Sequence, residues 1–150
     1  MNKKIMLLMM VSICAVISGC GAKNVNYKDG TYVGRSSIYT SEDGTDDGNG
    51  YGEVSITLKD NKVVECEFIT YEPDDKLKDE EYGKAHGEIA NRDFYNKAQK
   101  AIAACDEYEK LIVENGGLEG VDAISGATIN YNSLEEAMIE ALKQAEVEGK

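Results

Sequence analysis

The chain has 150 residues, a formal net charge of −12 at pH 7 and a charged fraction of 29%. This length supports one domain with a hydrophobic core rather than two. A protein this acidic is repelled by nucleic-acid phosphates and anionic lipid headgroups, so we expect no nucleic-acid partner. The one histidine, His86, stands apart from the cysteines, so we also expect no metal site.

Residues 1–19 have the organisation of an export signal. Two lysines precede an apolar run at 5–17, which is too short for a transmembrane helix of about 20 apolar residues. The run ends in Ile17-Ser18-Gly19-Cys20, which resembles the cleavage motif of bacterial lipoproteins. We therefore expect 1–19 to be a lipoprotein signal peptide, and Cys20 to receive diacylglycerol and fatty acids such as palmitate. An uncleaved anchor with an incidental cysteine is the alternative.

Lipid on Cys20 would hold the protein at the extracytoplasmic face of the cell membrane, with residues 20–28 as a lipidated tether. Cleavage removes two lysines and no acidic residue, so the net charge moves from −12 to −14. Such a charge should keep the body of the protein in water, with only the lipid inserted in the membrane.

Several segments after the tether alternate apolar and polar residues, which predicts β-strands. A first strand is expected at Thr31–Ile38, and a hairpin at Tyr51–Leu58 and Lys62–Tyr71 around an Asp60-Asn61 turn. The face of the hairpin that we expect to be buried carries Val54, Ile56, Leu58, Val64, Cys66 and Phe68. The polar loop 40–50 contains acids in a calcium-like order, but Thr45 and Val54 stand at ligand positions, which favours a solvated loop.

Two later segments have the period of amphipathic helices. The first has its apolar stripe from Phe94 to Ile112 and ends at Asn115-Gly116-Gly117. The second is expected to begin near Ser133, which forms a capping box with Glu136. Strands followed by helices predict an α+β fold, an antiparallel sheet with helices packed on one face, in a single domain over residues 29–147.

Two cysteines remain in the expected domain, Cys66 in a strand and Cys105 in a helix. An exported location permits a disulfide, but both positions also suit small buried side chains. The sequence leaves both possibilities open.

The segment between the two helices reads Asp122-Ala123-Ile124-Ser125-Gly126-Ala127-Thr128. Gly126 and Ala127 leave the backbone bare, so that a phosphate or an enzyme cleft can approach closely. A helix follows, whose free amide groups favour an anion. The hydroxyl of Thr128 is a poor nucleophile without a base, and none is obvious nearby, so we expect its activation to come from another enzyme.

This segment resembles the attachment site of the FMN-binding domain proteins, in which a flavin transferase joins FMN to the threonine hydroxyl through a phosphoester. Similar features are Asp29-Gly30-Thr31-Tyr32, Gly34, Ser36 and Gly50-Tyr51-Gly52. The family includes subunits of ion-pumping respiratory complexes and small extracytoplasmic flavoproteins. The resemblance implies covalent FMN on Thr128 and a flavin transferase as partner. One departure is Ile129-Asn130-Tyr131, where many relatives carry another hydroxyl residue.

Other roles near the motif stay open. Ser125 could bond the flavin phosphate or brace the loop, and Asp122 could be read by the transferase or end the preceding segment as a turn residue. Tyr131 or Tyr39 could stack on the flavin ring, although core packing is the commoner fate of tyrosines. The acids of 72–81 read as a solvated face.

We therefore expect an electron carrier rather than an enzyme with its own substrate. Its FMN would take electrons from a membrane donor such as quinone or a reductase and pass them to an extracytoplasmic acceptor. A flavin-free surface lipoprotein with a binding or structural role is one alternative. A flavin-dependent reductase is another.

Overall fold

The computed structural model describes residues 25–41, 43–44 and 48–147. The expected signal peptide, Cys20 and part of the calcium-like loop lie outside the described residues. The elements in chain order are β1 (Asn26–Tyr27), β2 (Gly30–Arg35), β3 (Tyr51–Lys59), β4 (Lys62–Tyr71), α1 (Arg92–Asn115), α2 (Thr128–Ala145) and β5 (Glu146–Val147). Among these residues no helix is both long and apolar enough to cross a membrane.

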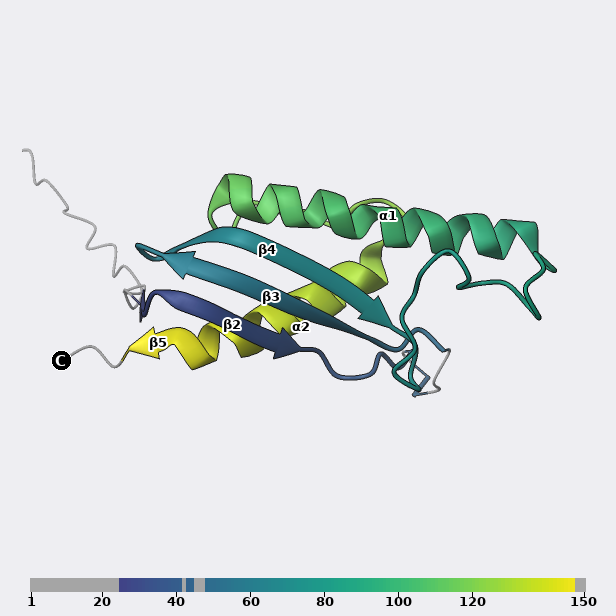
Figure 1. Ribbon diagram of the computed structural model, residues 1–150, viewed down its shortest axis with the longest axis horizontal. Coiled ribbons are helices and arrows are strands. Elements are labelled where there is room, and N and C mark those ends of the chain that lie inside the picture. The colour runs from purple at the N-terminus through teal and green to yellow at the C-terminus, as the bar shows by residue number, and fades with distance from the viewer. Residues whose placement is uncertain (1–24, 42, 45–47, 148–150) are drawn as a thin grey trace, which may run out of the picture.

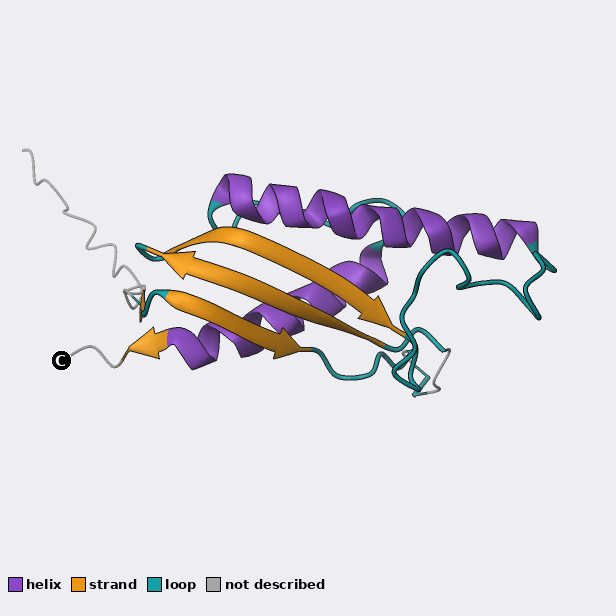
Figure 2. Cartoon of the chain, in the orientation of Figure 1, coloured by secondary structure: helices purple, strands orange, loops and turns teal. Residues whose placement is uncertain are grey.

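Strands β2, β3 and β4 form an antiparallel sheet in that order, while β1 and β5 pair in a separate two-stranded sheet (Figure 2). Helix α2 packs on β2 and β3, and α1 packs on β4 (Figure 1). The core between helices and sheet includes Val54, Ile56, Phe68, Tyr108, Ile112, Leu134 and Met138, all nearly inaccessible to water. This arrangement confirms the predicted α+β fold with an antiparallel sheet covered on one face.

The predicted β3–β4 hairpin is confirmed, but a bulge near the turn changes which side chains of β4 face the core. Asp60 and Asn61 both have positive φ, 52° and 62°, as the two central residues of a type I′ turn require. The pairing then shifts between Thr57 and Leu58, and Val64 has no partner in the register. Val63 is therefore buried and Val64 is 42% exposed, so the prediction that Val64 faces the core is wrong. A bulge inserts one residue and reverses the alternation beyond it.

Helix α2 lies directly on the backbone of the sheet at a glycine. A Cβ atom at Gly34 would stand 2.0 Å from the carbonyl oxygen of Ala137 and 2.5 Å from the amide nitrogen of Ala141. Both atoms belong to the α2 backbone and cannot move aside. Gly34 is therefore the residue that lets α2 approach β2, and this contact fixes the position of the helix on the sheet.

Helix α1 has the predicted C-terminal end at Asn115-Gly116, and its N-terminus has a side-chain cap. The side chain of Asn91 accepts a hydrogen bond from the N–H group of Phe94 at 3.0 Å, which caps the N-terminus. Gly116 ends the helix in the left-handed conformation, with φ 74°.

Candidate functional site

Helix α2 begins at Thr128, five residues before the predicted start at Ser133. The expected capping box is absent because tertiary contacts occupy both of its residues. Ser133 is buried against β3. A Cβ atom added at Gly52 would lie 3.1 Å from the Cβ atom of Ser133. Glu136 accepts hydrogen bonds from the N–H and hydroxyl groups of Ser37, at 2.9 and 2.6 Å. The helix instead begins at Thr128, one residue after the carbonyl of Ala127, which accepts its first bond.

The N-terminus of α2 has no side-chain cap among the described residues. Its N-cap residue, Ala127, has no side-chain acceptor to offer, and its carbonyl receives the first helical bond, from the N–H group of Tyr131 at 3.0 Å. The earlier N–H groups of the first turn point beyond the helix, where the helix dipole is positive. The exposed hydroxyl group of Thr128 thus lies at a helix end suited to an anion.

A tight turn precedes Thr128. The N–H group of Ala127 donates to the carbonyl of Ile124 at 2.9 Å, and Gly126 has φ 86°. A positive φ at the third position is typical of a type II turn and favours glycine there. This requirement explains the glycine of the motif without any reference to a ligand.

The hydroxyl group of Tyr108, on α1, holds this turn from inside the protein. It accepts a hydrogen bond from the N–H group of Ile124 at 2.8 Å and donates one to the carbonyl of Ala127 at 3.3 Å. Burial raises the pKa of Tyr108, so its hydroxyl group stays protonated and can accept one hydrogen bond while donating the other. The hydroxyl group of Tyr131 also donates to the carbonyl of Val121 at 2.8 Å. The segment that presents Thr128 is therefore fixed at both ends.

A pocket of about 350 Å³ opens beside Thr128. This volume lies in the range of small-molecule and cofactor sites, roughly 300–1,000 Å³. Its walls come from the first half of α1, the loop before α1, the start of α2 and, through Asn49, the loop before β3. The residues that line it include Lys78, Tyr82, Phe94, Lys97, Gly126 and Thr128.

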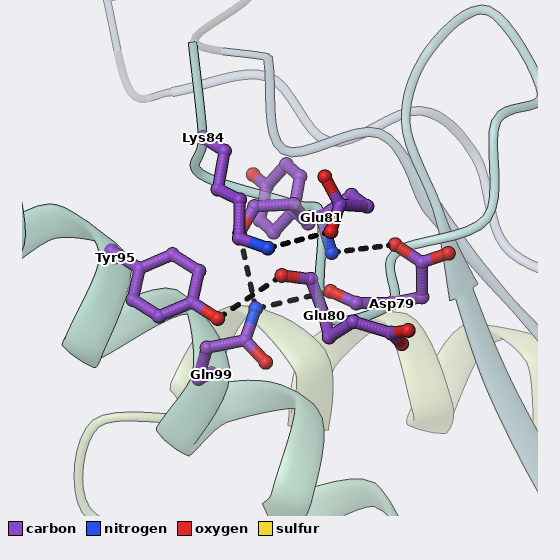
Figure 3. A network of polar contacts seen from close by, with 7 residues as sticks. Asp79, Glu80, Glu81, Lys84, Tyr95 and Gln99 are labelled. Atoms are coloured by element: carbon purple, nitrogen blue, oxygen red, sulfur yellow. Dashed lines mark hydrogen bonds and ion pairs between the residues drawn. The ribbon is translucent and has the colours of Figure 1, made fainter. Parts of the chain in front are cut away.

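Two aromatic rings stand at this pocket. Phe94 is 49% exposed, and the ring of Tyr82 meets it edge to face with 6.2 Å between centroids. The loop that carries Tyr82 is held against α1 (Figure 3). The side-chain amide of Gln99 donates to the carbonyls of Asp79 and Tyr82 at 3.0 Å each, and the hydroxyl group of Tyr95 donates to the carbonyl of Glu80 at 3.0 Å. These bonds position Tyr82 at the wall.

The pocket is positively charged in an otherwise acidic protein. Lys78 and Lys97 line it, and no acidic residue is among its described lining residues. Lys78 is buried, donates to the carbonyl of Asn49 and lies 4.9 Å above the centre of the Tyr82 ring. Lys100 is close to the turn, since a Cβ atom at Gly126 would stand 3.7 Å from its ammonium nitrogen.

The structure brings only part of the predicted site together. Gly126, Ala127 and Thr128 line the pocket. Ser125, in the turn, and Asp122, just before the turn, are exposed and do not line the pocket. Tyr131 does not line it either, because its ring packs against Tyr108, 5.8 Å away.

Sequence reasoning missed the aromatic and basic walls. Phe94, Lys97 and Ala101 recur at helical spacing on α1, so all three can face one pocket. The sequence signal is ambiguous, because the same spacing also places Phe94 on the apolar stripe of α1, whereas the structure leaves it 49% exposed. Tyr82 came from a loop whose path only the tertiary contacts determine.

Both cysteines of the domain are free thiols. Burial raises the pKa of Cys66 to about 12 and that of Cys105 to about 11, so both stay protonated at neutral pH. The side-chain amide of Asn130 lies 3.5 Å from the sulfur of Cys105 and donates to the carbonyl of Ala101 at 2.8 Å. Asn130 thus ties the first turn of α2 to α1, and Cys105 belongs to that packing.

Comparison with known proteins confirms the family resemblance of the sequence. The crystal structure of the CPE2226 protein from Clostridium perfringens is similar with a TM-score of 0.55 and 21% identity, over 80% of this chain and 89% of that chain. At this identity the likeness shows the fold. A search of curated proteins returned no match. The model of the FMN-binding domain family matches residues 48–143, which include the pocket and Thr128, and the chain therefore belongs to the FMN-binding domain family.

Proposed function

We propose that this FMN-binding protein is an electron carrier whose flavin is joined by its phosphate to the hydroxyl group of Thr128. One observation carries the proposal. Thr128 is exposed at the uncapped N-terminus of α2 and lines a pocket of about 350 Å³. A phosphoester there would lie against amide groups and lysines, and the rest of the cofactor would have a cavity to enter.

The pocket residues fit the two parts of FMN. Lys97 and Lys100, on α1, supply positive charge near the turn, which suits the phosphate. Phe94 and Tyr82 offer aromatic faces to a flat ring system. When bound, FMN supplies one- and two-electron redox chemistry, while the protein positions it and adjusts its potential.

The attachment step requires another enzyme. Thr128 needs a base to become a nucleophile, and among its described residues the pocket has neither a carboxylate nor a histidine. We infer that a flavin transferase activates Thr128 in trans. We also propose that lipid on Cys20 holds the carrier at the extracytoplasmic face of the membrane, where a covalent bond keeps the cofactor from diffusing away.

The proposal is tested by intact-mass spectrometry after co-expression with a flavin transferase. We expect the mature protein to gain the mass of one FMN minus one water, and Thr128→Ala to abolish the gain. Ser125→Ala is the matched control, because Ser125 is an exposed hydroxyl residue three positions away that does not line the pocket. An unmodified, colourless wild-type protein would contradict the proposal and favour a flavin-free lipoprotein. Membrane fractionation of Cys20→Ala tests the anchor separately.

A further inference from the structure

The loop before α1, which supplies part of the pocket wall, carries exposed large apolar side chains. Leu77, Ile89 and Phe94 are 45%, 40% and 49% exposed, and all three belong to the loop before α1 or to its first turn. We call this part of the surface, residues 72–94, the docking end. Exposed apolar side chains beside a cofactor pocket are typical of a surface that another protein covers.

The charges of the docking end indicate what kind of protein could cover it. Residues 72–91 contain seven acidic residues and three lysines, which leaves an excess of four negative charges. Lys76 and Lys84 already pair with acids of the same loop, Glu72 and Glu81. Asp74, Glu80 and Glu88 are exposed. The segment that carries the apolar side chains is therefore acidic overall, and such a surface attracts a basic one.

The described N-terminal segment leaves the domain at the opposite end. Strand β1 pairs with β5, and the N–H group of Lys28 donates to the carbonyl of Ala145 at 2.8 Å, at the C-terminus of α2. The N–H group of Tyr27 also donates to the side chain of Asn61 at 2.7 Å. Figure 1 shows β5 at one end of the molecule and the loop before α1 at the other.

The length of α2 separates the tether from the pocket. Thr128 is the first residue of the helix, and at 1.5 Å per residue its far end is about 26 Å away. The six residue steps from Cys20 to Asn26 span at most about 20 Å when extended. Because the domain is attached at β1 and repelled by anionic headgroups, we infer that its pocket, near the other end of α2, faces away from the bilayer.

We propose that the docking end binds a redox protein in the aqueous phase whose own surface is basic around its redox centre. This inference rests on the proposed function, because it assumes flavin on Thr128 and lipid on Cys20. The inference also favours one of the two electron donors expected from the sequence, a reductase over a quinone. A reductase with a domain in water meets this geometry, whereas a quinone inside the bilayer does not.

Cytochrome c, a basic haem protein, is a suitable probe. The flavin-bearing protein is first reduced by illumination with EDTA, which is oxidised and supplies the two electrons and two protons. Two ferric haems then take the two electrons of one flavin, and its two protons pass to water. Asp74→Asn, Glu80→Gln and Glu88→Gln together should lower the second-order rate at low ionic strength by about tenfold. The control combines Glu107→Gln, Glu114→Gln and Glu119→Gln, three exposed acids toward the other end of α1. It removes the same charge and should change the rate by less than about twofold.

A second measurement needs no flavin. A carbodiimide joins carboxylates to lysines in contact, and we expect its cross-links between cytochrome c and Thr128→Ala protein to fall within 72–91. Cross-links elsewhere, or equal slowing by the two triple variants, would overturn the proposal. Loss of covalent flavin would refute the proposed function but would leave the cross-link map unchanged, so the two failures are distinguishable.

The tether geometry has its own test, on vesicles that carry the lipidated flavoprotein and a reduced quinone in the bilayer. A Gly-Ser linker of about twelve residues inserted before Asn26 adds a mean reach of about 20 Å. We expect slow flavin reduction in the original protein and faster reduction with the linker. Fast reduction that the linker does not change would contradict the inferred orientation.

Discussion

The hydroxyl group of the fully buried Tyr108 accepts a hydrogen bond from the N–H group of Ile124 at 2.8 Å. This bond joins the middle of α1 to the turn that presents Thr128. It gives a core tyrosine a direct part in shaping the attachment site.

Tyr108→Phe should therefore destabilise the protein by about 1–3 kcal/mol, because it leaves the N–H group of Ile124 without its acceptor while keeping the ring. Urea unfolding of the flavin-free protein measures the change. Tyr95→Phe removes a hydroxyl bond to the loop carbonyl of Glu80 near the surface, and it should cost less than about 0.5 kcal/mol. Equal costs for the two variants would contradict the role assigned to Tyr108.

Gly34→Ala should prevent stable folding, because its new Cβ atom would overlap the α2 backbone at Ala137 and Ala141. We expect a cost of several kcal/mol, near the whole stability of a small domain. Circular dichroism and urea unfolding measure it. Gly117→Ala is the control, since a Cβ atom there meets nothing within 4 Å and the residue needs no positive φ. A Gly34→Ala protein as stable as the control would show that the helix can shift on the sheet.

The strands and α1 could be predicted because local patterns and packing agree there. The β3–β4 hairpin follows from alternation and an Asp-Asn turn, and α1 from its stripe and its terminal glycine. The bulge at Val64 could not be predicted, because one inserted residue leaves no separate signal in an apolar run.

The start of α2 was mispredicted for a different reason. Ser133 and Glu136 match a capping pattern, but the core and Ser37 use them instead. The helix begins instead at Thr128, where the sequence has no capping signature. The pocket walls could not be predicted from the sequence either, because Tyr82 meets Phe94 only through contacts between the loop and α1.

Phe94→Ala should change the environment of the flavin without removing it. The ring is half exposed, so we expect the unfolding free energy to change by less than about 1 kcal/mol. Intact mass should still show one FMN, while the visible circular dichroism of the flavin should change, because the ring that packs against it is gone. Val113→Ala, a comparable exposed apolar residue near the other end of α1, should leave this spectrum unchanged. An unchanged spectrum in Phe94→Ala would place the flavin ring elsewhere.

The buried thiols predict a loss of stability at alkaline pH. Burial raises the folded-state pKa of Cys66 to about 12 and that of Cys105 to about 11, above the unfolded value of about 8.5. The folded state then holds more protons than the unfolded state, so this contribution is present below about pH 8.5 and is lost as pH rises toward 11–12. Urea midpoints between pH 7 and 10.5 should fall. A Cys66→Ala, Cys105→Ala double variant should show a shallower fall, and an identical slope would refute the assignment.

The position of the flavin bond tests most directly whether Thr128 carries the cofactor. Trypsin cuts after Lys110 and Lys143, so one peptide, residues 111–143, contains Thr128 together with Ser125, Tyr131 and Ser133. Fragmentation of this peptide from the co-expressed protein separates the four hydroxyl groups. We predict that the added mass of FMN minus water lies on Thr128 alone. The same mass on Ser125, Tyr131 or Ser133, or a peptide that carries no added mass, would contradict the account.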